Sequence, residues 1–200
     1  MASKEKTAFE VSVSNITRNN IQNIPGTFGA VEDDEFVGDI CPAGTLCIPL
    51  ALMENDGYTG ILNGNTWQMI VAEDGKAGRL GDHTGIYAFN SYDVRKVQSG
   101  ENVWALGANM LGLELPAKAL GDFTEIIVGE QYTFGEGNFD TLPADDTEIY
   151  VAIDDGYLVA SSTPPTDGDG VYFKILRTKS FTEGTRYAGF DGYVCQALRA

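Results

Sequence analysis

Residue types that support acid–base and nucleophilic chemistry are scarce in this sequence. His83 is the single histidine, and Cys41, Cys47 and Cys195 are the three cysteines. A nucleophilic serine or cysteine needs a base beside it, so such a pair would have to use His83, which stands in a glycine-flanked turn typical of an exposed histidine. The odd number of cysteines and their spacing are not typical of a disulfide framework or a zinc site. We therefore interpret the cysteines as reduced, buried hydrophobic residues and predict no catalytic residues.

Sequence motifs that bind phosphates, metals or acyl groups are absent as well. The chain contains no G-x-S-x-G nucleophile elbow, no Walker loop and no H-E-x-x-H zinc motif. Gly135 and Gly137 lie among turn signals, without the alternation of strands and helices that dinucleotide binding requires. We therefore expect neither an enzyme nor a cofactor.

Carboxylates are abundant, and they gather between residues 119 and 173. This stretch contains twelve acidic residues and no lysine or arginine. A pair of them could serve a glycosidase, but strand alternation accounts for the neighbouring aromatic residues as core or sheet-face residues. Calcium binding is another candidate role for these carboxylates, because Ca²⁺ prefers hard oxygen ligands on short loops. The candidate calcium ligands are Asp154, Asp155, Asp167 and Asp169. None has the EF-hand spacing, and aspartate and glycine are also the usual residues of tight turns, so we predict no metal site.

Glycine-containing turns separate the elements that would have to position any functional residue. Glycine accounts for 24 of 200 residues, and it recurs about every 5 to 12 residues, which is typical of short strands joined by tight turns. Strand-like stretches cover residues 44–52, 66–72, 85–89, 123–128, 148–153, 156–160, 171–178 and 189–198. The pattern predicts a mainly β protein, a β-barrel or β-sandwich with short strands and tight Gly/Asp turns. At most one or two short helices are expected, and residues 102–115 are the best candidate.

The first 35 residues differ from the rest and predict an extended N-terminal arm. The β-rich domain would then cover residues 36–200, and it could divide into two subdomains near residues 116–122. Phe9, Val11, Val13 and Ile16 form an alternating apolar edge that could add a strand to a neighbouring subunit. These four residues are the interface candidates. A frayed tail without a function is the alternative interpretation.

The charge of the chain limits its partners. There are 29 acidic and 13 basic residues, for a formal net charge of −16. Such a chain repels phosphate groups, so we expect no nucleic-acid partner and no membrane partner. The last 30 residues carry a net charge of +3, so acidic and basic surfaces of two copies could associate, or the acidic face could simply keep the protein soluble. No signal peptide and no apolar run of about 18 residues is present, which predicts synthesis in a cytoplasm.

One turn, together with the strand that follows it, carries a family resemblance. Residues 39–49 read Asp-Ile-Cys-Pro-Ala-Gly-Thr-Leu-Cys-Ile-Pro, a P-A-G-T turn that leads into a strand. This segment resembles the opening of small β-rich head-decoration and related capsid-associated proteins of tailed bacteriophages, and residues 85–94 and 171–194 are similar in style. The resemblance implies a virion protein, made in the host cytoplasm, that binds the outside of the capsid. Its implied partners are the major capsid protein and copies of itself, in a homo-trimer or homo-dimer.

Three other functions stay open at this level. A phage tail or fibre adaptor would have the same β-rich, acidic and symmetric character. A carbohydrate-binding β-sandwich is a second alternative, although the missing signal peptide argues against a secreted module. The third is a small hydrolase or isomerase on a β-barrel, for which His83 would be the leading residue. Trp67 and Trp104 lie in apolar stretches, which favours a place in the core over a role as sugar platforms.

Overall fold

The computed structural model of the chain describes seven segments, and nearly all of them are β-strands joined by turns. The segments are residues 6–12, 23–52, 66–76, 83–91, 114–166, 170–181 and 189–200. Within these segments the helical content is a single 3₁₀ turn, η2 (Glu136–Asn138), and none of it is a helix long and apolar enough to cross a membrane. The prediction of a mainly β fold is therefore confirmed. Most of the helical candidate 102–115 lies outside the described residues, and its last two residues form the short strand β8 (Glu114–Leu115).

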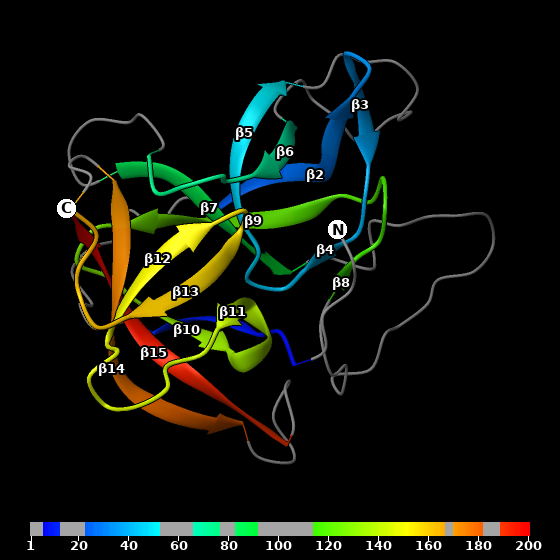
Figure 1. Ribbon diagram of the computed structural model, residues 1–200. Coiled ribbons are helices and arrows are strands. Elements are labelled where there is room, and N and C mark those ends of the chain that lie inside the picture. Colours follow the sequence, from blue (N-terminus) through cyan, green and yellow to red (C-terminus); the bar gives the residue numbers. More distant parts are fainter. Residues whose placement is uncertain are drawn as a thin grey trace.

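Five strands close into a small barrel (Figure 1). Around the ring they are β2 (Asn23–Glu32), β6 (Trp67–Val71), β5 (Leu46–Leu52), β7 (His83–Ser91) and β9 (Gly121–Ile127). The ring closes because β2 pairs on both sides, so that Gly26 lies opposite Trp67 of β6 and Gly121 of β9. A Cβ atom at Gly26 would lie 2.6 Å from Cγ of Met69, so a larger residue here would have to displace the Met69 side chain. Strand β3 (Glu35–Gly38) pairs with the end of β2 and forms a hairpin with it.

The interior of the barrel is apolar and aromatic. Its buried residues are Phe28, Cys41, Ala43, Cys47, Met69, Tyr87, Phe89, Leu115 and Phe123. Cys41 and Leu115 come from a separate two-stranded sheet, in which β4 (Cys41–Pro42) pairs with β8. Strand β7 shows the alternation clearly, because Tyr87 and Phe89 belong to this cluster whereas Ile86 and Ala88 belong to the core on the other side of the barrel wall. Both faces of the wall are therefore buried at β7.

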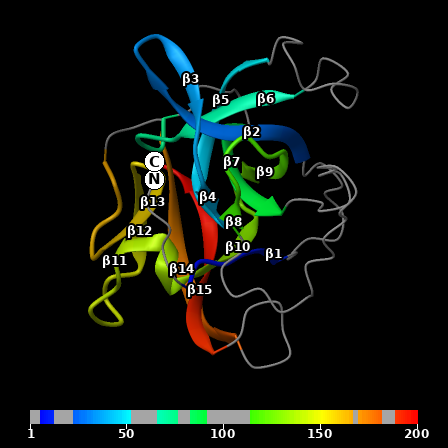
Figure 2. The same ribbon diagram turned by 90° about the vertical axis from the view of Figure 1, so that its right-hand side faces the viewer.

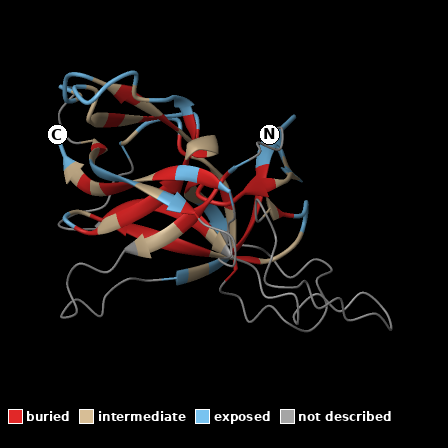
Figure 3. Cartoon of the chain, turned by 90° about the horizontal axis from the view of Figure 1, so that it is seen from below, coloured by how far each residue is buried: buried red, intermediate tan, exposed pale blue. Residues whose placement is uncertain are grey.

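A seven-stranded open sheet packs against the outside of the barrel (Figure 2). Its order is β1 (Phe9–Ser12), β10 (Gln131–Gly135), β15 (Phe190–Arg199), β14 (Val171–Phe181), β12 (Tyr150–Asp154), β13 (Tyr157–Ser161) and β11 (Phe139–Thr141). Only the last pair, β13 with β11, is parallel. The rings of Phe9, Phe134 and Phe173 form a chain across the sheet, with centroid distances of 5.4 and 5.2 Å. The two layers thus share one core, and buried residues run along the strands of both (Figure 3).

The described parts of residues 1–35 are strands of these two layers, contrary to the expectation of an arm. Strand β1 pairs with β10 of the same chain, and the Phe9 side chain is 1% exposed. Val11 is half-buried and packs against the same core, so the two described residues of the alternating apolar edge pack within the chain. Residues 23–32 form β2, without which the barrel cannot close. Val13 and Ile16 lie outside the described residues.

The expected break near residues 116–122 does not separate the two layers. Strand β9 begins at Gly121 and belongs to the barrel, together with strands that precede the break. Strand β1, near the N-terminus, belongs to the open sheet, together with strands that follow the break. The chain therefore crosses between the layers on both sides of this point.

Candidate functional site

The three cysteines lie in the core. Cys41, Cys47 and Cys195 are free and fully buried, as the sequence interpretation expected. Burial raises the pKa of the Cys195 thiol, and burial together with the neighbouring Cys41 raises the pKa of Cys47. Because the thiolate is the nucleophilic form, these environments disfavour cysteine reactivity.

The structure describes some of the histidine and tryptophan residues named in the sequence analysis. His83 begins β7 and pairs through its backbone register with Ile127. Trp67 is half-buried and packs against the barrel core, in agreement with the expectation of a core residue. Trp104 lies outside the described residues.

Two of the four candidate calcium ligands can be located. Asp154 ends β12, Asp155 occupies the following turn, and both are exposed. Asp167 and Asp169 lie outside the described residues. Over the described ranges, no group of three or more histidine, cysteine or acidic side chains comes together in a way that could hold a metal ion.

A pocket opens where two barrel strands diverge. Strands β2 and β6 run parallel and stay paired as far as Phe28 and Met69. Beyond this point β2 pairs with β3, whereas β6 continues along β5. The backbone N–H of Asp39, just after β3, donates to the carbonyl oxygen of Phe28 at 3.0 Å and holds the far side of the gap in place. The divergence leaves a pocket of about 540 Å³.

A turn from the open sheet closes one side of this pocket. Asp155 and Gly156 have φ angles of 45° and 79°, as a two-residue type I′ hairpin between β12 and β13 requires. The N–H groups of Asp155 and Gly156 donate to the carbonyl oxygens of Glu73 and Ala72, at 3.1 and 2.8 Å. The Gly156 carbonyl accepts from the N–H of Leu46 at 3.1 Å. The turn is therefore fixed to the barrel by its backbone, and this contact places Asp155 and Tyr157 in the pocket.

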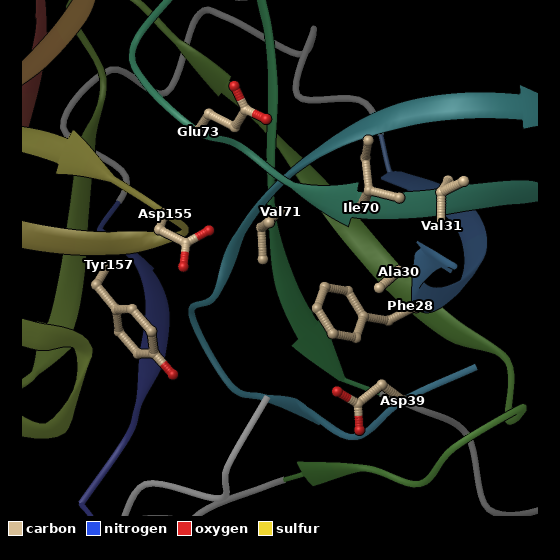
Figure 4. A pocket seen from close by; sticks show the side chains of 10 residues that line it. Phe28, Ala30, Val31, Asp39, Ile70, Val71, Glu73, Asp155 and Tyr157 are labelled. Atoms are coloured by element: carbon tan, nitrogen blue, oxygen red, sulfur yellow. The ribbon is translucent and has the colours of Figure 1, made fainter. Parts of the chain in front are cut away.

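The pocket combines an apolar wall with acidic groups. Its described lining residues are Phe28, Gly29, Ala30, Val31, Asp39, Ile70, Val71, Glu73, Asp155 and Tyr157. Figure 4 shows the Phe28 ring extending from the barrel side and the Tyr157 ring from the hairpin side, with Asp39, Glu73 and Asp155 around them. Burial and the nearby Asp155 carboxylate raise the pKa of Tyr157, so its hydroxyl remains a proton donor at neutral pH.

The β2–β3 hairpin stands out beside the pocket, at the top of the barrel in Figure 2. Its tip is Glu32-Asp33-Asp34-Glu35, and positive φ angles of 49° and 65° at the two aspartates form a tight turn. Val31 and Val37 are 51% and 41% exposed on its arms. Because Val31 lies opposite Phe36 and Val37 opposite Ala30, the hairpin presents one exposed valine on each face below a strongly acidic tip.

Comparison of the chain with protein-family models, curated proteins and solved structures finds no match. The candidate site consequently rests on the pocket and the neighbouring hairpin. Among the pocket residues, only Asp155 was a candidate site residue in the sequence analysis. The Asp-Gly pair at 155–156 correctly marked a turn, but local sequence carries no signal that this turn docks on a barrel strand about 80 residues earlier in the chain.

Proposed function

We propose that this protein is a structural component of a phage virion, which binds the outside of the capsid through surface contacts and performs no catalysis. The observation that carries the proposal is the protruding β2–β3 hairpin with its exposed Val31 and Val37. Exposed apolar side chains on a rigid, backbone-paired element favour a protein–protein contact. Among the described strands β3 pairs with β2 alone, so its outer edge is available to a strand of a neighbouring subunit.

The turn that carries the family resemblance also supports a structural role. In the P-A-G-T segment the Thr45 N–H and hydroxyl both donate to the carbonyl oxygen of Pro42, at 3.1 and 2.8 Å. Gly44 adopts a φ angle of 78°, and the N–H of this glycine donates to the carbonyl oxygen of Phe89 at 2.8 Å. These residues are committed to building the turn and joining it to β7, which suits a scaffold without a reactive site.

The first test asks whether the protein travels with particles. Particles from the organism that encodes the chain would be purified on a density gradient and analysed by mass spectrometry. We expect peptides of this protein at stoichiometric level in the fraction that holds intact particles. Their confinement to the soluble fraction would contradict the proposal. Electron microscopy of labelled particles then separates a capsid location from a tail or fibre location.

The second test addresses the hairpin. The double variant Val31→Asp, Val37→Asp should fold normally, because both side chains are exposed, but should lose association with the particle. Leu142→Asp is a matched control, because Leu142 is 44% exposed on the loop after β11. Equal loss of association in both variants would contradict a specific role of the hairpin.

Light scattering on the purified protein tests the proposed homo-trimer or homo-dimer, and a glycan array tests the carbohydrate-binding alternative.

A further inference from the structure

We propose that the pocket between β2, β6 and the β12–β13 turn binds an organic cation, an ammonium or guanidinium group carried on an aliphatic chain. The proposal does not depend on a virion role. It rests on the charge of the pocket lining, on the apolar wall that accompanies this charge, and on the separation of the acidic groups.

The charged side chains of the described pocket lining all have the same sign. Three carboxylates, from Asp39, Glu73 and Asp155, line it, and its described lining contains no lysine or arginine. They come from three separate parts of the fold, the segment after β3, the segment after β6 and the β12–β13 turn. Asp39 is held in place, because its Oδ1 accepts a hydrogen bond from the Ile40 N–H at 2.7 Å. The Glu73 and Asp155 carboxylates beside the apolar wall, in a chain of net charge −16, favour a cationic occupant.

The wall of the pocket favours an organic cation over a metal ion. Phe28, Ile70, Val71 and the ring of Tyr157 offer apolar surface that suits the methylene groups of an alkyl chain. The half-buried Tyr157 ring can in addition attract a cation through its face. No three acidic side chains of the described residues are close enough to coordinate one metal ion. A volume of about 540 Å³ is within the usual range for small-molecule pockets.

The occupant could be a free diamine or a lysine side chain of a partner protein, and both present the same chemistry. A titration followed by two-dimensional amide NMR would use 1,5-diaminopentane in one arm and N-acetyl-lysine methylamide in the other. We expect saturable shifts at the amides of Ala30, Val71 and Tyr157, and weaker binding in 0.5 M salt because screening reduces the attraction. If only the diamine saturates the pocket, its occupant is assigned as a free amine. If both ligands saturate it, the occupant is assigned as a lysine side chain of a partner protein.

Variants on one hairpin provide the matched comparison. Asp155→Asn should weaken binding about three- to fivefold, as expected for the loss of one partly exposed charge pair. Asp154→Asn removes a neighbouring exposed carboxylate that does not line the pocket, and it should leave the affinity unchanged. Tyr157→Ala should also weaken binding, because it removes a ring that lines the pocket.

Three results would overturn the inference. The first is equal weakening by Asp154→Asn and Asp155→Asn, which would indicate only a general attraction to an acidic surface. The second is equal binding of the uncharged 1,5-pentanediol or of a neutral sugar. The third is the absence of saturable shifts with either amine while the folded NMR spectrum is retained.

Discussion

The side-chain amide of Asn138 donates a hydrogen bond to the backbone carbonyl oxygen of Ala43, 2.6 Å away and 95 residues earlier in the chain. The Oδ1 atom of the same side chain accepts from the N–H groups of Ala8 and Gly135, each at 3.0 Å. One buried asparagine therefore joins the N-terminal strand, the end of β10 and the turn that enters the barrel. Because these contacts are buried, their hydrogen bonds cannot be replaced by water without a rearrangement.

Replacement of Asn138 by alanine should therefore destabilise the fold strongly. The change leaves the Ala8 N–H and the Ala43 carbonyl without this partner, whereas the Gly135 N–H keeps its second bond, to the Ala8 carbonyl oxygen at 3.0 Å. We expect a loss of about 2–4 kcal/mol in the free energy of unfolding. Urea denaturation followed by fluorescence measures this loss. Asp140→Asn, an exposed change two residues along, is the control and should shift the midpoint little. A midpoint for Asn138→Ala equal to that of the control would contradict the bridging role.

Two glycines with similar backbone angles should respond differently to alanine. Gly44 and Gly129 have φ angles of 78° and 91°. A Cβ atom at Gly44 would lie 2.7 Å from Nδ2 of Asn138, whereas a Cβ at Gly129 would have no neighbour within 4 Å. We expect Gly129→Ala to cost about 1–2 kcal/mol from the backbone conformation alone, and Gly44→Ala to cost clearly more. Similar thermal midpoints for the two variants would show that the Asn138 contact has no energetic role.

Deletion of residues 1–30 should abolish folding of the chain. The deletion removes β1 and most of β2, and β2 is the strand that pairs with both β6 and β9 to close the barrel. Far-UV circular dichroism and proton NMR of the truncated protein test this expectation. A folded, monomeric product would instead favour a dispensable arm.

A point variant tests the same packing without a truncation. Phe9→Ala should cost about 3–5 kcal/mol, because this buried ring stacks on Tyr132 at 5.8 Å. Glu10→Gln, on the adjacent and more exposed position, serves as its control, and it should cost much less even though Glu10 forms an ion pair with Lys179. Equal midpoints for the two variants would place Phe9 outside the core.

Tyr132 should make stability depend on alkaline pH. Its hydroxyl accepts from the Ile127 N–H at 2.8 Å and donates to the Glu125 carbonyl at 3.2 Å. Burial raises its pKa above the ordinary value of 10.0, so the folded state retains the proton while the unfolded state loses it. Its stabilising contribution is therefore complete below about pH 10 and falls above it, by about 1.4 kcal/mol per pH unit.

Comparison with Tyr132→Phe isolates this effect. At pH 7 the variant should be less stable by about 1–3 kcal/mol, because the Ile127 N–H loses its partner. This difference should shrink as the pH rises from 10 to 11 in urea titrations of both proteins. A difference that stays constant over this range would mean that the hydroxyl ionises equally well in the folded and unfolded states.

Local sequence determined the class of fold and many of its turns. Alternating apolar residues separated by glycine predicted strands, because side chains in a strand point alternately to two faces. The Asp155-Gly156 pair forms one of the tight Gly/Asp turns that the sequence predicted, because this turn needs two positive φ angles that aspartate and glycine tolerate. The features that depend on neighbouring residues in the chain, strands and tight turns, were thus predicted correctly.

Tertiary structure alone decided which strands pair and where the pocket lies. The alternation of Phe9 and Val11 is the same whether the partner is another subunit or β10 of the same chain, so the sequence could not separate an arm from a sheet strand. Asn138 resembles any polar turn residue until Ala8 and Ala43 are brought beside it. The pocket arises because β2 leaves β6 after Phe28 and the turn at Asp155 docks on the barrel. These contacts join residues far apart in the chain, and their partners are fixed only when the whole core packs.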